Sequence, residues 1–288
     1  SGVFYATTID IARITEAPNF TDEESPTIKY TNPFGNNVTT LQACISLTGA
    51  TDDIAYRDIS KTGTSYTFEL TDEERGLLRS AATENTLDIK FYIRTDYGQQ
   101  SYYSYVSKTM SIVNANPIFY NFTYKDINRD IVDNLTGDNQ TLIKGYSNIQ
   151  GTVSVANKAI AQKSATMLKY RLSIDDKIDE VDYSDTEDVS ATINGASNNV
   201  ITMYAIDSRG NSTLKQITAS NYINYQKINI GSILVTRVNN VQSETKLKFS
   251  GYIWNGNFGL VENSIEECYY RYKKTREDIW SDNITITP

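Results

Sequence analysis

The sequence predicts an all-β fold built from serial modules, and two observations lead to this prediction. The first is strand-like alternation: in residues 87–94 the apolar side chains point one way and the polar side chains the other, which is typical of a half-buried strand. The second is an internal repeat of a strand followed by a turn. The strand runs into an Asp-Gly turn at residues 96–98, and an alternating strand over residues 201–206 runs into a similar turn at residues 207–211.

A strand earlier in each module repeats as well. Apolar alternation over residues 41–47 is matched by alternation over residues 168–174, and a third match lies at residues 268–272. Between these strands and the Asp-Gly turns, the second module contains Asn194-Gly195, a dipeptide that favours a β-hairpin. Two full modules and part of a third are therefore predicted.

One helix is expected, between two strands of the first module and within residues 70–85. Thr71 is suited to be its N-cap, and Glu74 stands three residues later, where it completes a capping box. Its expected apolar stripe is Leu77, Leu78 and Ala81.

The module boundaries follow from turn formers. Asn114-Ala115-Asn116-Pro117 separates two alternating strands, and a softer boundary lies near residues 221–227. We predict a β-sandwich with an inserted short helix in residues 1–115, a β-sandwich in residues 116–226, and a partial or small β domain in residues 227–288. Because the third module ends before an Asp-Gly strand, the natural chain is expected to continue past Pro288; a smaller terminal domain is the alternative.

Composition excludes several functions. The 288 residues carry a net charge of -8, which disfavours nucleic acid as a partner. No apolar run is long enough to insert into a membrane. The absence of histidine removes the usual base of nucleophilic triads and the commonest zinc ligand, and no phosphate-binding glycine pattern occurs. We therefore expect a protein that is not an enzyme and has no cofactor, with Ca²⁺ as the one candidate ion.

Calcium is considered because of a dense acidic stretch over residues 175–188. Carboxylate oxygens are the ligands that Ca²⁺ prefers, and the candidate ligands are Asp175, Asp176, Asp179 and Asp182. The alternative is a solvated loop whose like charges repel one another.

Tyrosine is abundant, with 21 residues. A local concentration beside the first Asp-Gly turn predicts a binding surface, since an exposed tyrosine offers a flat apolar ring and a hydroxyl for sugars or proteins. The alternative is that tyrosine fills strand positions, where it has a high propensity. The candidate binding residues are Tyr97, Tyr102, Tyr103 and Tyr105.

Several stretches, taken in their order along the chain, resemble the immunoglobulin-like minor structural proteins of long-tailed phages (siphoviruses) that infect Gram-positive bacteria. They include Glu16-Ala17-Pro18-Asn19-Phe20-Thr21, Leu70-Thr71-Asp72-Glu73-Glu74-Arg75, Asn121-Phe122-Thr123-Tyr124-Lys125-Asp126, Leu135-Thr136-Gly137-Asp138-Asn139-Gln140, Asp207-Ser208-Arg209-Gly210-Asn211-Ser212 and Gly251-Tyr252-Ile253-Trp254-Asn255.

This resemblance implies tandem Ig-like β-sandwich domains in a viral structural protein of the virion, in the tail or tail tip, assembled in the cytoplasm of the host bacterium. The modules would act as a spacer and in host adhesion. Other phage tail proteins and a host cell-wall glycan or surface protein are the implied partners, and no catalytic residue is carried over. Two alternatives stay open: a module of a bacterial cell-surface adhesin or stalk, and a carbohydrate-binding accessory module of a polysaccharide-degrading enzyme.

Overall fold

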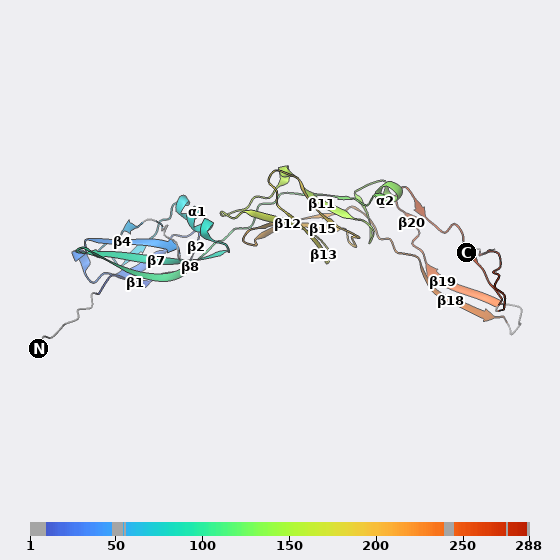
Figure 1. Ribbon diagram of the computed structural model, residues 1–288, viewed down its shortest axis with the longest axis horizontal. Coiled ribbons are helices and arrows are strands. Elements are labelled where there is room, and N and C mark those ends of the chain that lie inside the picture. Colours follow the sequence, from blue (N-terminus) through green and yellow to red (C-terminus); the bar gives the residue numbers. More distant parts are fainter. Residues whose placement is uncertain (1–9, 48–53, 55, 239–244, 275, 287–288) are drawn as a thin grey trace.

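The computed structural model describes residues 10–47, 54, 56–238, 245–274 and 276–286. Figure 1 shows three β-rich modules that follow one another along the longest axis of the molecule. We call them the first, second and third module; the first two surround separate hydrophobic cores, one built from residues between Ala12 and Ala115 and one from residues between Phe119 and Ala219. The all-β tandem architecture expected from the alternating patterns is confirmed.

Two sheets form the first module. One sheet has the order β2-β8-β7-β4-β5 and the other β1-β3-β6. Their bounds are β1 Arg13–Glu16, β2 Phe20–Thr21, β3 Thr27–Thr31, β4 Thr40–Leu47, β5 Arg57–Asp58, β6 Ser65–Thr67, β7 Thr86–Tyr97 and β8 Gln100–Ser111, with a 3-10 turn at Gly35–Asn37. The core centres on Phe91, whose ring lies 5.9 Å from that of Phe20 and 5.5 Å from that of Phe68.

The inserted helix α1 (Asp72–Ala81) has the predicted capping box. The backbone N–H of Glu74 donates to Thr71 Oγ1 at 3.2 Å, and the N–H of Thr71 donates to Glu74 Oε2 at 2.8 Å. Glu74 also pairs with Arg57 of β5, which fixes the helix to the edge of the five-stranded sheet. The predicted apolar stripe is partly wrong: Leu78 is buried, whereas Leu77 is 62% exposed, because only one narrow side of this short helix faces the core.

The second module also has two main sheets, with the orders β13-β12-β15-β16 and β14-β11-β9, and a parallel pair of β10 with β17. The strands are β9 Thr123–Asp126, β10 Thr141–Ile143, β11 Ile149–Val153, β12 Met167–Ile174, β13 Lys177–Asp182, β14 Val189–Ile193, β15 Val200–Asp207, β16 Ser212–Thr218 and β17 Asn221–Ile223. Helical turns lie at α2 Arg129–Ile131, Val132–Thr136 (η2) and Val155–Asn157.

Two local expectations for the second module are wrong. Leu168 was expected to share the buried face of its strand, but it is 51% exposed because the pairing register with β15 shifts between Met167 and Lys169. Asn194-Gly195 does not close a hairpin, because β14 and β15 belong to different sheets. Gly195 nevertheless has the positive φ, +61°, of a tight turn.

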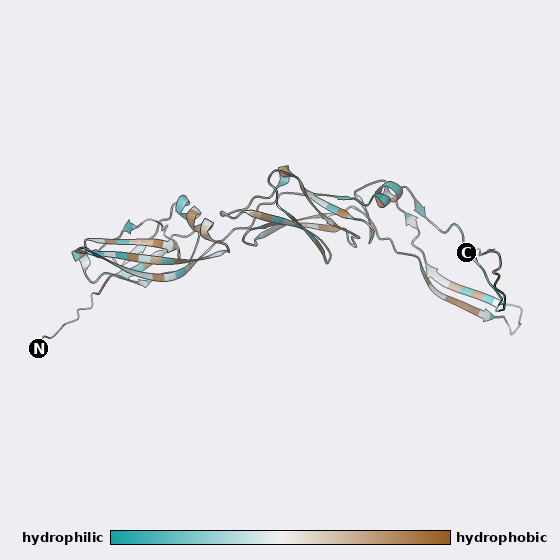
Figure 2. Cartoon of the chain, in the orientation of Figure 1, coloured by the Kyte–Doolittle hydropathy of each residue, from teal (hydrophilic) through white to brown (hydrophobic). Residues whose placement is uncertain are grey.

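The third module contains three separate two-stranded sheets in the part of the chain that the structure describes. Its strands are β18 Asn229–Arg237, β19 Thr245–Tyr252, β20 Gly256–Asn257, β21 Glu262–Asn263, β22 Tyr269–Tyr270 and β23 Ile284–Thr285. Apolar side chains of the β18–β19 hairpin stay exposed, among them Ile233 and Phe249, and Figure 2 shows apolar residues along both strands. This module is therefore much less packed than the other two.

Phe91→Ala should destabilise the first module strongly, by about 3–5 kcal/mol, because it removes a fully buried ring and leaves a cavity. Hydrogen exchange of the β4, β7 and β8 amides, followed by mass spectrometry, measures this loss locally. As a control, Leu77→Ala removes an exposed side chain and should change protection by less than about 0.5 kcal/mol. Equal protection in wild type and Phe91→Ala would contradict this account of the core.

Candidate functional site

The four candidate tyrosines do not form one surface. Tyr103 and Tyr105 lie on the outer side of the five-stranded sheet and are 53% and 55% exposed. Tyr102 lies opposite Thr95, which is buried, and is therefore on the core side of β8. Tyr97 stacks on Phe34, with ring centroids 4.8 Å apart.

A third ring, which the sequence analysis did not single out, joins the exposed pair. Tyr92 of β7 lies directly opposite Tyr105, and the two ring centroids are 5.2 Å apart. The ammonium of Lys90 lies 4.7 Å from the centre of the Tyr105 ring. We call Lys90, Tyr92, Tyr103 and Tyr105 the tyrosine face. Cross-strand pairing is the signal that could have identified it, because the register of a hairpin decides which side chains meet.

The four candidate calcium ligands are spread over the β12–β13 turn and β13. The Asp175 carboxylate accepts hydrogen bonds from Ser197 and Asn198, which lower its pKa, and the Asp179 carboxylate accepts from the backbone N–H of Thr192. Among the described residues, no three acidic, histidine or cysteine side chains lie close enough together to hold a metal ion. Calcium binding by Asp175, Asp176, Asp179 and Asp182 stays a prediction.

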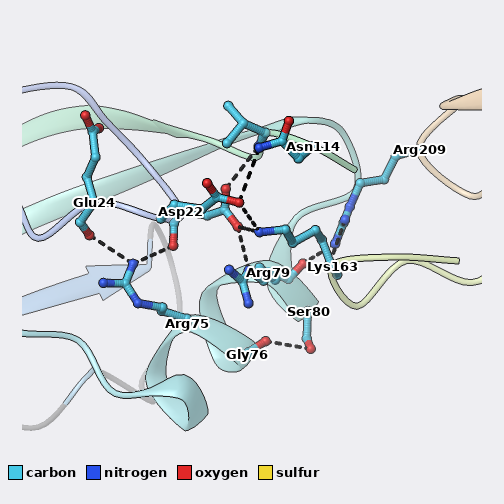
Figure 3. A network of polar contacts seen from close by, with 11 residues as sticks. Asp22, Glu24, Arg75, Gly76, Arg79, Ser80, Asn114, Lys163 and Arg209 are labelled. Carbon is cyan, nitrogen blue, oxygen red and sulfur yellow. Dashed lines mark hydrogen bonds and ion pairs between the residues drawn. The ribbon is translucent and has the colours of Figure 1, made fainter. Parts of the chain in front are cut away.

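An extended network of polar contacts lies between the first and second modules. Figure 3 shows Asp22 there, between Arg79 of the first module and Lys163 of the second. The Asp22 side chain is 0% exposed, and its Oδ2 accepts from Arg79 Nε at 2.6 Å and from Lys163 Nζ at 3.1 Å. Its Oδ1 accepts from the backbone N–H of Val113, in the connecting segment, at 3.0 Å. One carboxylate therefore binds both modules and the segment between them.

The second module also extends a turn into this site. Asp207 organises the β15–β16 turn, because its Oδ1 accepts from the backbone N–H groups of Arg209 at 2.9 Å and Asn211 at 2.8 Å. Arg209 then donates to the backbone carbonyls of Arg79 and Ala82, at the C-terminal end of α1, and to that of Lys163. Carbonyls at a helix C-terminus have no partner within the helix, so Arg209 caps α1 from the neighbouring module.

A pair of amides closes the same contact. Asn211 Nδ2 donates to Asn85 Oδ1 at 3.1 Å, and Asn85 Nδ2 donates to Asn211 Oδ1 in return. We call the set Asp22, Arg79, Asn85, Val113, Lys163, Arg209 and Asn211 the first junction. The turn at residues 207–211 is visible in the sequence as a module signature, but its contact with the first module is not.

The second and third modules meet through apolar side chains. Phe258 and Trp254 of the third module pack against Ile131 and Ile143 of the second, and the Leu260 N–H donates to the carbonyl of Leu135 at 2.7 Å. We call these residues, together with Gly259, the second junction. A Cβ on Gly259 would lie 2.4 Å from the carbonyl oxygen of Thr136, and its φ of +125° is unfavourable for other residues. Only glycine therefore allows this approach.

The electrostatics of the first junction depend on Asp22. Burial alone would raise the pKa of Asp22, but hydrogen bonds from Val113, Arg79 and Lys163 outweigh it and hold the pKa below its usual value. Burial lowers the pKa of Arg209, whose guanidinium remains charged at neutral pH.

This lowered pKa predicts acid sensitivity. The contribution of Asp22 to stability should be complete above about pH 4, the value of an unfolded aspartate, and should be lost as the pH falls through the lower folded-state pKa. At pH 6, the free energy of unfolding of Asp22→Asn should be about 2 kcal/mol lower than that of the wild type. This difference in free energy should become smaller below about pH 3. Urea unfolding at several pH values measures it. Asp176→Asn, at an exposed turn, is the control; a gap independent of pH would exclude this mechanism.

Comparisons with known proteins give structural likeness only. No family model and no curated protein matches the sequence. Similar solved structures include a chimeric titin Z1Z2 tandem (9% identity, 76% of this chain and 98% of that one, TM-score 0.24), a Ca²⁺-stabilized adhesin of an Antarctic bacterium (11%, 82% and 54%, TM-score 0.29) and fibronectin(III)-like modules of Clostridium thermocellum CbhA (9%, 74% and 94%, TM-score 0.26). Similarities this low do not assign a function.

Proposed function

We propose that the chain is a non-enzymatic structural component of a phage tail, in which serial β-modules act as a spacer of fixed geometry. The observation that supports this proposal is the first junction, where the buried Asp22 carboxylate binds Arg79, Lys163 and the backbone of Val113. Separating a buried carboxylate from one of its cationic partners strongly destabilises the folded state. The two modules therefore have a preferred relative orientation, which is what a spacer requires.

The tail setting follows from the family resemblance. Its partners would be other tail proteins and, at the host surface, a cell-wall glycan or protein, and assembly would take place in the host cytoplasm. Many copies on a symmetric particle would increase the avidity of weak surface contacts. In the described residues, no helix is long and apolar enough to cross a membrane.

Electron microscopy tests the setting directly. Gold-labelled antibodies raised against this chain should bind the tails of phage particles purified from a lysate of the bacterium that carries its gene. Labelling of intact, uninfected cells and not of particles would contradict the tail assignment and favour a cell-surface stalk instead.

The spacer role predicts a narrow distance distribution between the modules. Spin labels at Ser107→Cys and Lys215→Cys place one label on an exposed strand position of the first module and one on the second. The native Cys268 is replaced by serine so that it takes no label, and Cys44 is buried. Pulsed dipolar spectroscopy should give one narrow distribution in this background. Adding Lys163→Ala and Arg209→Ala should broaden it, because both side chains bridge the modules.

The matched control is Lys169→Ala with Arg171→Ala. These residues carry the same charges but pair with Glu180 inside the second module. The control should leave the distribution narrow. A broad distribution in the labelled background itself would argue against a spacer of fixed geometry.

A further inference from the structure

The tyrosine face lies on the most regular part of the molecule. Strands β7 and β8 are 12 residues long each, and they pair without a register shift from Thr86 opposite Ser111 to Tyr97 opposite Gln100. The inner side of β7 is anchored in the core by Ile89, Phe91 and Ile93. Side chains on the outer side are therefore held by a rigid support, and a ligand would not have to order a loop.

The apolar surface on this outer side is aromatic. Among the described residues of β4, β7 and β8, the exposed large hydrophobic side chains are Tyr97, Tyr103 and Tyr105, with no leucine, isoleucine or methionine. Tyr103 and Tyr105 lie on the outer side, whereas Tyr97 has the strand parity of the buried Thr95 and lies on the inner side. Hydroxyl groups flank the rings, since Ser101 and Ser107 lie on the same side of β8, one before Tyr103 and one after Tyr105. The exposed β18–β19 hairpin differs, because it presents aliphatic residues such as Ile233 and Val235.

Charges on this side are balanced. Arg94 Nε lies 3.0 Å from Asp96 Oδ1, and Asp88 accepts a hydrogen bond from the hydroxyl of Thr109 at 3.3 Å. Lys90 is directed over the Tyr105 ring. The surface therefore has little excess charge with which to attract a polyanion.

Flat rings, flanking hydroxyl groups and balanced charge together match a sugar. The C–H groups on one face of a pyranose ring carry partial positive charge and stack on the negative face of an aromatic ring, while its hydroxyl groups need donors and acceptors nearby. We propose that the tyrosine face binds an uncharged pyranose polysaccharide, with Tyr103 and Tyr105 stacking on sugar rings and Tyr92 and Lys90 supporting Tyr105. This binding site is independent of the spacer role and of the first junction.

Binding of the full chain, clustered on beads, to three soluble neutral polysaccharides, a glucan, a galactan and a rhamnan, tests the proposal, with poly(glycerol phosphate) as the anionic probe. We expect saturable binding to at least one neutral polymer, and about a tenfold loss of affinity in Tyr103→Ala with Tyr105→Ala. Tyr103→Phe with Tyr105→Phe should retain most of the binding, because the rings remain.

The control variant is Tyr120→Ala, which removes an exposed tyrosine at the start of the second module and should bind like wild type. Thermal unfolding of each variant shows that the fold is kept. The proposal is overturned if none of the three neutral polymers binds, or if the double alanine variant binds as well as wild type. If only poly(glycerol phosphate) binds, and Lys90→Ala abolishes this binding, the ligand of the tyrosine face is a polyanion and not a neutral sugar.

Discussion

The arrangement of the first two modules depends on one buried carboxylate. Asp22 lies in the first module, but its hydrogen bonds reach Arg79 on α1, Val113 in the connecting segment and Lys163 in the second module. Because the Asp22 side chain is 0% exposed, the loss of Arg79 or Lys163 would leave its buried charge with one cationic partner in place of two. The helix inserted into the first module thus has a clear structural purpose, since it supplies both Arg79 and the carbonyls that Arg209 caps.

The second junction follows the same plan with different chemistry. A helical turn near the end of one module presents backbone carbonyls, and a loop of the next module donates to them: Arg209 does so for α1, and the Leu260 N–H does so for Leu135. Charged groups surround the first contact, whereas Trp254, Phe258 and Tyr225 surround the second, with ring centroids 4.8 to 5.6 Å apart. In both junctions, therefore, backbone carbonyls of a helical segment accept hydrogen bonds from the next module, from a guanidinium side chain in the first and from a backbone N–H in the second.

Local features of this fold could be predicted from the sequence, and long-range ones could not. The capping box of α1 and the buried face of β7 depend on residues three or two positions apart, so their patterns are visible in the chain. Leu168 escaped prediction because a register shift changes which residues face the core. The contact of Asp22 with Lys163 joins residues 141 positions apart, and nothing local marks it. Likewise, four neighbouring tyrosines were visible, and alternation alone places Tyr102 and Tyr103 on opposite sides of a strand. Strand pairing is needed to tell which side faces the core and to bring Tyr92 to Tyr105.

The contrast between the two junctions has a consequence for how the chain responds to its surroundings. Ionic contacts weaken as salt screens them, although burial moderates the effect, whereas apolar contacts weaken on cooling and are strengthened by salts such as sulfate. The relative orientation of the first and second modules should therefore be held less firmly in concentrated salt. The orientation of the second and third modules should be held less firmly at low temperature. The first junction thus responds to salt concentration and the second to temperature. The arrangement of the three modules at low temperature and low salt therefore differs from the arrangement at high temperature and high salt.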